Sequence, residues 1–542
     1  MLHQTPDNPS SVYQALHITE ILRAVIQSLD RNSQKRCTVV CKAWSEIVLD
    51  VLWYRVIALR EFLSAFGNLQ QTQIIGGQTK FTFVPAPKYS DWERFETKYC
   101  SRICVFQITE DSSYSEVLNT LARIRPSRPL LPNLHTLECH GLGGVGIGEM
   151  AAMFVHESIT ACTIRTLGDY NEATVAFLET LRARMPNLTE LSLTLNSRAR
   201  YDATVKTFIQ GFPKLKRLTI PPFSDSSSAF VDLSELPGLE CLRVVSDLGQ
   251  GIINNFIPVE KKLDCFASLT TLRLFCSYQT ATNFFRNQLS TLSDIEIFSI
   301  YHEQPAVIQS LLTDISKTCL RVKAISLLLK KSEVEKKDVD LTDALTIHHI
   351  RPVLSNPSIT TFRIHHVRPM NLVQADAEEI AHSWPNILHL SLCPDPLFNQ
   401  SAPAEPRPTL GLESLLPFAR LCPFLETLGL LLNATSSAFI PADDAVDSDS
   451  LTFDNLHTLV VGVSPIERER SVATFLCHMV KSGFRVVYES EWYTADSQST
   501  DSKRWKDVDE LLPVLISVRI RSMNGMRRIC NGSASATGAK TE

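Results

Sequence analysis

Apolar residues near the amino terminus recur at the spacing of an α-helix. Six of them fall on a single helical stripe: Ile18, Ile21, Leu22, Val25, Ile26 and Leu29. Asp30, Asn32 and Ser33 then interrupt the pattern, and all three are good helix N-caps. A second stripe follows, at Cys37, Val40, Cys41, Trp44, Ile47, Val48, Val51 and Leu52. We therefore predict two or three short helices over residues 16–55, with a shared core too small to be stable without a partner.

Beyond residue 100 the chain repeats one hydrophobic phrase, apolar-x-x-apolar-x-apolar. The phrase begins at Ile103, Leu134, Ile159, Leu188, Leu215, Leu239, Leu269, Ile295, Val322, Ile359, Ile387, Leu425, Leu456 and Leu515. From Ile103 to Leu456, successive starts are 24 to 38 residues apart. Eight of the phrases have a proline two residues before their first apolar position: Pro132, Pro186, Pro213, Pro237, Pro357, Pro385, Pro423 and Pro513. Since only 28 of 542 residues are proline, this coincidence indicates a fixed register.

The position of the proline explains how each repeat is built. Proline cannot continue the preceding helix, so it ends that helix and lets the chain enter a short strand. Residues 175–184, which have a helical pattern, precede Pro186 in this way, and residues 484–488 supply one more strand. The period and the phrase resemble those of leucine-rich repeats. That resemblance implies an α/β fold of stacked strand–helix units, with a parallel sheet on the concave face.

These patterns divide the chain into five segments. We expect a disordered amino terminus over residues 1–15 and the helical module over residues 16–55. A linker over residues 56–100 is expected to be helical at first and then irregular. The repeat solenoid follows over residues 101–525, and residues 526–542 are expected to be a disordered tail.

The amino-terminal module also carries a recognisable series of short motifs. They are Ile18-Thr-Glu-Ile-Leu22, Leu29-Asp30, Arg36-Cys37, Val40-Cys41-Lys-Ala-Trp44 and Leu52-Trp53. This series resembles the F-box of fungal F-box proteins, although Thr19 stands where that family usually has a proline. The combination with repeats resembles F-box leucine-rich-repeat proteins.

The resemblance implies a partner and a role. In that family the F-box packs against a Skp-type linker protein, which bridges to a cullin-RING scaffold, while the repeats bind the protein to be ubiquitinated. The residues implied in linker binding are Ile18, Ile21, Leu22, Leu29, Val40, Cys41 and Trp44. The expected function is therefore that of a substrate adaptor of an SCF-type ubiquitin ligase. The alternative is a ligase-independent repeat scaffold or inhibitor whose amino-terminal helices only cap the array.

Composition and charge narrow the classes of function. The net charge is -5, so the chain lacks the overall positive field that would favour nucleic acid as a partner. We find no stretch of about 18 consecutive apolar residues and no signal-peptide pattern, which predicts no membrane association and a cytoplasmic or nuclear location. Cys37, Cys41, Cys104 and Cys162 lie within helix or strand patterns and are interpreted as reduced, small hydrophobic residues.

Few motifs suggest chemistry. Gly141-Leu-Gly-Gly-Val-Gly146 has the spelling of a dinucleotide-binding turn, but no acidic residue closes the next predicted strand. The pairs His348-His349 and His365-His366 have no Cys-x-x-Cys companion and are expected at loop or strand surfaces. We predict no catalytic residues, no cofactor and no metal.

The solvated face of the predicted sheet is defined by the residue between the second and third apolar positions. These residues are Gln107, Glu138, Thr163, Ser192, Thr219, Arg243, Arg273, Ser299, Ser326, Arg363, Ser391, Gly429, Val460 and Arg519. Arg243 and Arg273 should be neighbours on consecutive strands. Either they extend into water or pair with nearby carboxylates, or they receive an acidic or phosphorylated substrate segment together with Arg217.

Overall fold

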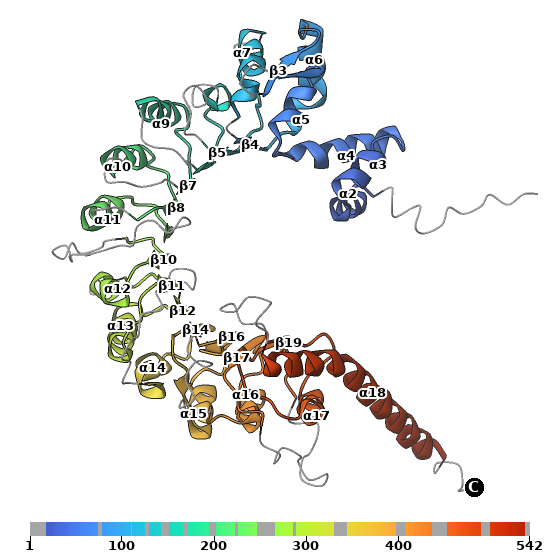
Figure 1. Cartoon of the computed structure of the whole chain (residues 1–542), viewed down its shortest axis with the longest axis vertical. Coiled ribbons are helices and arrows are strands. Elements are labelled where there is room, and N and C mark those ends of the chain that lie inside the picture. Colours follow the sequence, from blue (N-terminus) through green and yellow to red (C-terminus); the bar gives the residue numbers. More distant parts are fainter. Residues whose placement is uncertain are drawn as a thin grey trace, which may run out of the picture. The chain divides into compact units, whose positions relative to one another are not determined.

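The computed structural model describes most of the chain. It covers residues 18–73, 79–109, 111–124, 129–141, 151–165, 172–194, 202–222, 226–245, 266–285, 289–329, 344–396, 408–435, 452–488 and 499–536. The chain forms two compact units, one built mainly from Met1–Ser224 and the other mainly from Ile252–Glu542. In each unit, parallel strands alternate with helices (Figure 1).

The first unit begins with helices and continues as a parallel sheet. Its helices are α2 (Thr19–Ser28), α3 (Arg31–Cys37), α4 (Lys42–Tyr54), α5 (Leu59–Ser64), α6 (Tyr89–Lys98), α7 (Ser115–Ile124), α9 (Glu172–Arg184) and α10 (Asp202–Gln210), with short 3₁₀ turns η1 (Cys100–Arg102), η2 (Ser112–Tyr114) and η3 (Ala152–Phe154). The strands of its sheet, in spatial order, are β1 (Arg55–Val56), β4 (Val105–Thr109), β5 (Thr136–His140), β6 (Ala161–Arg165), β7 (Glu190–Thr194) and β8 (Arg217–Ile220). A separate antiparallel hairpin joins β2 (Leu69–Gln73) and β3 (Thr79–Phe83).

The second unit repeats the same alternation. Its helices are α11 (Ser226–Ser234), α12 (Tyr278–Phe285), α13 (Pro305–Thr318), α14 (Ile347–Leu354), α15 (Gln374–Ser383), α16 (Leu415–Leu421), α17 (Glu469–Met479) and α18 (Thr500–Ala536), with the 3₁₀ turn η6 (Leu412–Ser414). The strands of its sheet are β9 (Cys241–Val244), β10 (Thr271–Phe275), β11 (Asp294–Ser299), β12 (Ala324–Leu329), β14 (Thr361–Ile364), β16 (His389–Leu392), β17 (Thr427–Leu430), β18 (Thr458–Val460) and β19 (Arg485–Val487). A small parallel pair joins β13 (Leu345–Thr346) and β15 (Met370–Asn371).

The strand positions confirm the repeat register. Leu188, Leu191 and Leu193 are the three apolar positions of one phrase, and all are buried around strand β7. Leu425, Leu428 and Leu430 repeat this arrangement at β17. The extra strand predicted within residues 484–488 is also present, as β19. Each unit is thus a solenoid-like stack of strand–helix repeats, whose apolar phrase faces the helices and whose other sheet face we call the open face.

Hydrogen bonds in the turn before each strand join neighbouring repeats. In the first unit the backbone N–H groups of Thr189 and Glu190 both donate to the carbonyl of Thr160, at 2.8 and 3.0 Å. The side-chain amide of Asn187, beside Pro186, donates at 3.0 Å to the carbonyl of Glu157 in the preceding repeat. These bonds satisfy backbone groups that the proline turn would otherwise leave unpaired. The same pair of backbone bonds recurs in repeats without the proline, as at Ser293 and Asp294, which both donate to the Thr270 carbonyl.

One phrase was predicted in the wrong register. Leu292, Ile295 and Ile297 are the true apolar positions of its repeat, because Ile295 pairs with Leu272 of the preceding strand. The prediction began the phrase at Ile295 and therefore placed Ser299 on the open face, where the structure has Glu296. Ser299 is buried instead. Both registers satisfy the hydrophobic phrase, and this repeat has no proline to distinguish them.

The phrase at Leu515 is not a strand. It lies inside helix α18, whose buried residues Trp505, Val508, Leu512 and Ile516 follow the helical period. The Asp509 carboxylate accepts a hydrogen bond from the backbone N–H of Val486 at 2.7 Å. Helix α18 thus satisfies one backbone donor of strand β19. Arg519, expected on the open face, donates to the carbonyls of Cys477 and Val480. The helix continues to Ala536, into the segment expected as a disordered tail.

The described residues of the segment predicted as a linker form helices and strands. It opens in helix α5, as expected, but the part predicted to be irregular contains the β2–β3 hairpin and helix α6. Strand β1 already belongs to the sheet, since Arg55 and Val56 pair with Val105 and Phe106. Phe62, Phe66 and Phe95 are fully buried and pack edge-to-face or stacked on one another. The array therefore starts directly after α4.

The motifs that suggested chemistry have structural explanations where they are described. Gly141 adopts a positive φ of 76°, while the other glycines of its motif lie outside the described residues. His348 and His349 lie on helix α14 rather than on a strand or loop. His366 is buried, and its Nε2 contacts the carbonyl of Glu303 at 2.9 Å. Among the residues described, no group of side chains is arranged to hold a metal ion.

Most of the described cysteines are buried, as expected of small hydrophobic residues. Cys162 is fully enclosed on β6, and burial raises the pKa of its thiol to about 12. Cys37 and Cys104 are half-buried, but Cys41 is exposed. Over the described part of the chain, we find no helix with the length and apolar character needed to span a membrane.

Candidate protein-binding sites

The helices α2, α3 and α4 form a small amino-terminal helical module. Its core contains Leu22 and Ile26 from α2 and Val48 and Leu52 from α4. Asp30 caps α3 by accepting the backbone N–H groups of Asn32 and Ser33, as its N-cap role predicted. A hydrogen bond from the Ser33 hydroxyl, together with these backbone bonds, lowers the pKa of the Asp30 carboxyl, so it is ionised at the positive end of the helix dipole.

The module exposes apolar side chains on α2 and in the turn before α4. Ile18, Ile21 and Val25 of the α2 region are 48%, 41% and 41% exposed, and their spacing of three and four residues places them on one helix face. Val39 and Val40, in the turn before α4, are 85% and 59% exposed. We call these five residues the apolar face of the module. Exposed large apolar residues on so small a helical module make these positions candidates for contact with a partner.

The structure separates the residues predicted for linker binding into three groups. Ile18, Ile21, Val40 and Cys41 are exposed, whereas Leu29 and Trp44 are half-buried. Leu22 is only 2% exposed and belongs to the core of the module. Val25 and Val39 complete the apolar face but were not among the predicted site residues. The apolar stripe of α2 includes both buried and exposed positions. Only the packing of α4 against α2 shows which of these positions are buried.

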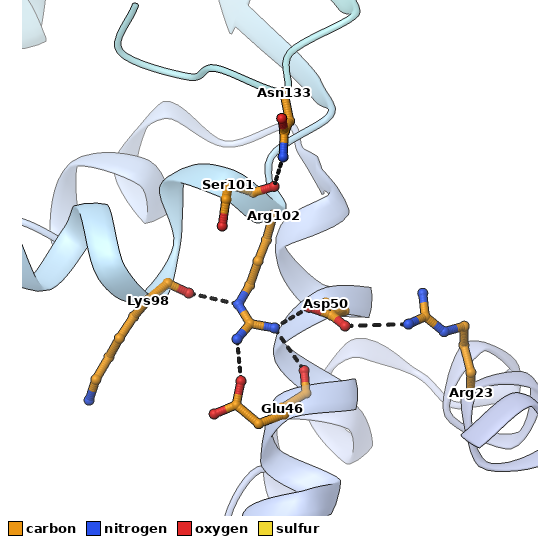
Figure 2. A network of polar contacts seen from close by, with 7 residues as sticks. All are labelled: Arg23, Glu46, Asp50, Lys98, Ser101, Arg102 and Asn133. Carbon is orange, nitrogen blue, oxygen red and sulfur yellow. Dashed lines mark hydrogen bonds and ion pairs between the residues drawn. The ribbon is translucent and has the colours of Figure 1, made fainter. Parts of the chain in front are cut away.

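A polar network fixes the module to the first repeats. The Arg102 guanidinium, at the end of η1, points into α4 and contacts the side chains of Glu46 and Asp50 (Figure 2). It also donates at 2.9 Å to the Glu46 carbonyl, and its Nε donates at 2.7 Å to the Lys98 carbonyl. Asp50 in turn pairs with Arg23 of α2 at 3.3 Å. The Arg102 side chain is only 16% exposed, whereas Glu46 and Asp50 are 56% and 38% exposed, so the network is buried at the guanidinium and reaches solvent at the carboxylates.

Sequence reasoning did not find this network. Its directly bonded residues are separated by up to 56 residues, and each is an ordinary charged residue on a helix. On the neighbouring side, the Asn133 amide donates at 2.7 Å to the Ser101 carbonyl, which ties η1 to the next repeat turn. The module is therefore held by η1 as well as by the chain that leads from α4 into β1.

On the open face of the second unit, Arg243 and Arg273 are neighbours as predicted. They pair in register on β9 and β10, and the next residue in the same row is Glu296 on β11. Arg273 forms an ion pair with Glu296, and its guanidinium carbon lies 5.5 Å above the Phe298 ring. An internal carboxylate therefore neutralises one arginine, which agrees with the first of the two alternatives. Arg243 is exposed beside this pair.

Two further residues of the prediction, Arg217 and Gly429, are not placed as expected. Arg217 belongs to the first unit, where its Nε pairs with Glu190 at 3.3 Å. Gly429, expected on a solvated face, is buried. A Cβ at this position would lie 2.8 Å from Ser391 Oγ and 3.3 Å from Pro394 Cγ. The segment after β16 thus covers the sheet at β17, and the row from Arg243 to Ser391 is the more accessible part of the open face.

Beside the row, two residues before Ser391 on β16, burial favours a neutral form of His389. Burial, assisted by the positive charge of Arg363, lowers the pKa of His389, while Glu426 has the opposite effect. His389 is therefore expected to be uncharged at neutral pH. The positive charge of the row resides in Arg243, Arg273 and Arg363, with Glu296 as its carboxylate.

Comparison with known proteins gives little further information. No family model and no curated protein matches the sequence. A solved structure with some similarity is that of the Toll–Spatzle complex, described as a molecular hub in Drosophila development and innate immunity. The TM-score is 0.37 and the sequence identity is 13%, over 80% of this chain and 55% of that chain. The chain thus spans about half the length of that structure's chain, and the fold assignment rests on the register and burial described above.

Proposed function

We propose that this chain is a non-catalytic substrate adaptor of a cullin-RING ubiquitin ligase. In this proposal the amino-terminal helical module is an F-box that binds a Skp-type linker, and the repeats bind the protein substrate. The observation that carries the proposal is the apolar face, which includes three of the residues implied by the F-box resemblance: Ile18, Ile21 and Val40.

The apolar face also distinguishes the proposal from its rival. A module that only caps the array needs one apolar side, packed against the repeats, and a polar outer side. Here Leu22 and Ile26 are buried in the module's own core with Val48 and Leu52, while Ile21 and Val25 beside them remain exposed. The core accounts for the first pair, and capping leaves the second unexplained. A partner that covers both Ile21 and Val25 accounts for them.

The attachment of the module suits an adaptor. Ubiquitin transfer depends on holding a substrate lysine near the charged carrier, which is a proximity effect and requires a firm connection. The network around Arg102 joins the module to the first repeats through both side-chain and backbone groups (Figure 2). The proposed role requires no nucleophile, metal or cofactor from this chain.

Copurification tests the proposed function directly. The full-length chain, coexpressed with a Skp-type linker and a cullin from a fungus, is expected to bring down the linker in a stoichiometric complex. The cullin should follow only when the linker is present. A folded full-length chain that binds neither protein would refute the adaptor proposal and favour the capped scaffold.

Substrate capture tests the arginine row. Replacing Arg243 and Arg273 with alanine is expected to reduce capture of an acidic or phosphorylated substrate at least tenfold, because both charges leave the accessible part of the open face. The measurement is affinity purification with the proteasome blocked, followed by quantitative mass spectrometry. The linker recovered in the same purification reports on folding.

A matched variant replaces two other exposed basic residues of the second unit, Arg321 and Lys323, with alanine. It changes the net charge by the same amount and should leave capture unchanged. Equal capture by both double variants and the unmodified chain would remove Arg243 and Arg273 from the substrate site.

A further inference from the structure

Two adjoining cavities lie in the first unit, beside the amino-terminal helical module but away from its apolar face. The first has a volume of about 330 Å³ and is bordered by residues of α3, α4, β1 and α5. The second has a volume of about 480 Å³ and is bordered by α5, the start of β2 and α6. Arg60 and Ser64 of α5 line both cavities. The two cavities therefore adjoin at α5, and we call them together the groove.

The first cavity is apolar in its depth. Leu52 and Val56 are 7% and 1% exposed and form its floor with Trp53. Trp53 is half-buried, and its ring lies against Tyr99 with centroids 4.4 Å apart. A cavity of this volume with an aromatic wall has room for one large apolar side chain. The second cavity is more polar, since Asn68, Asp91 and Arg94 contribute to its lining.

The groove carries an excess of positive charge. Its basic residues are Arg31, Lys35, Arg60 and Arg94, and its acidic residues are Glu61 and Asp91. Glu61 binds both Arg31 and Lys35, at 2.5 and 3.1 Å, so one carboxylate serves two cations. Partial burial would raise the pKa of Glu61, but the hydrogen bonds from Arg31 and Lys35 outweigh it and lower the pKa. Glu61 is therefore ionised, and both of its carboxylate oxygens already bind cations.

Arg60 is the cation at the junction of the two cavities. Its side chain is exposed, and its guanidinium carbon lies 5.6 Å above the ring of Phe81. Within the described residues it forms no ion pair, whereas Arg94 pairs with Asp91 at 3.4 Å. The aromatic ring orients the Arg60 stem and leaves its N–H groups available for an acceptor. This positive groove stands in a chain whose net charge is -5.

We propose that the groove binds an acidic peptide segment of a partner protein, with one bulky apolar side chain as its anchor. The apolar side chain enters the first cavity against Leu52 and Trp53, and carboxylates on either side of it approach Arg60 and the cations of α3. An extended peptide advances about 3.3 Å per residue, so a few residues reach from one cavity across α5 to the other. The charge selects the acidic segment, and the apolar cavity selects the anchor.

This inference does not rest on the proposed ligase function. The groove is lined by α3, the end of α4 and α5, whereas the apolar face consists of Ile18, Ile21, Val25, Val39 and Val40. A chain that fails to bind a Skp-type linker is still expected to bind an acidic peptide. The two proposals therefore fail separately.

The test uses fluorescence polarisation with the full-length chain and the peptide Glu-Asp-Phe-Asp-Glu-Glu-amide, which carries fluorescein on its amino terminus. We expect saturable binding that weakens at least tenfold when the peptide Phe is replaced by Ala. Arg60→Glu should also weaken binding at least tenfold, while Arg123→Glu, the same change at an exposed site on α7, should leave it unchanged. Ser64→Tyr, which fills the junction without changing charge, should block binding as well. Circular dichroism of each variant verifies folding.

Three outcomes would overturn the proposal. The first is no binding of the peptide by the folded chain at concentrations up to about 1 mM, which is weaker than a specific peptide contact. The second is equal binding by the Arg60→Glu and Arg123→Glu variants. The third is equal binding of the Phe and Ala peptides, with both displaced by inorganic pyrophosphate, since that would describe a simple anion site without an apolar anchor.

Discussion

Placing a charge on the apolar face of the amino-terminal helical module is expected to abolish linker binding. Ile21→Asp and Val40→Asp should each weaken the affinity for a Skp-type linker about 100-fold, or about 2.7 kcal/mol. The reason is that docking would bury an unpaired carboxylate in an apolar contact. The measurement is the dissociation constant of the purified full-length chain for the linker, by calorimetry or interferometry.

The structure supplies a closely matched control for this experiment. Ile57 lies between β1 and α5, outside the module, and is 50% exposed, against 41% for Ile21. Ile57→Asp therefore makes the same chemical change at similar exposure and should retain the affinity of the unmodified chain. Leu22→Ala is less informative, because Leu22 is in the core and its truncation would also destabilise the module by about 2 to 5 kcal/mol. If Ile21→Asp and Val40→Asp bind as well as Ile57→Asp, the apolar face is not the docking surface.

A charge placed at the interior of the first unit is expected to unfold the repeats around it. Leu191 on β7 is 1% exposed and lies between Cys162 and Leu218 in the register of the sheet. Leu191→Asp would bury a carboxylate without a partner, which costs several kcal/mol. We expect it to lower the free energy of unfolding by about 4 kcal/mol or more, as measured by urea unfolding.

The neighbouring residue provides the comparison. Ser192 is half-buried on the open face, between Thr163 and Thr219 of the adjacent strands. Because its side chain reaches water, Ser192→Asp should change the free energy of unfolding by no more than about 1 kcal/mol. Limited proteolysis should cut Leu191→Asp within residues 160–220 and leave Ser192→Asp intact. Similar sensitivity of the two variants would contradict the strand register of this unit.

The repeat architecture was predictable because the residues of each repeat carry the pattern that predicts its own strand. A strand of the type Leu188-x-x-Leu191-x-Leu193 buries alternate residues whatever its neighbours are, and Pro186 marks its start from within the same repeat. The helices of the amino-terminal module were predictable for the same reason, as was the capping role of Asp30. The Skp-type linker protein, the ligase and the substrate remain predictions, since the local sequence pattern does not identify binding partners.

The errors arose where the local pattern allows two solutions. Ile295 satisfies the phrase either as its first or as its second apolar residue, and only its pairing with Leu272 decides between them. Leu515 satisfies the phrase within a helix whose buried stripe, Trp505 to Ile516, has an equally good period. In both cases the competing interpretations bury similar side chains locally. The choice depends on contacts with another part of the chain.

By itself, the sequence determined the repeating strand–helix order, the short helices at the amino terminus and the rows of residues that share a sheet face. Only the tertiary structure decided which half of the α2 stripe is buried, and it placed Leu22 in the core and Ile21 at the surface. It also joined Arg102 to Glu46 and Asp50, paired Arg273 with Glu296 and gathered the residues of the groove around Arg60. The physical reason is that hydrophobic periodicity is a short-range property, repeated every two or four residues. Ion pairs, cavities and exposed faces arise between segments that are far apart in the chain, and they exist only once the chain has folded.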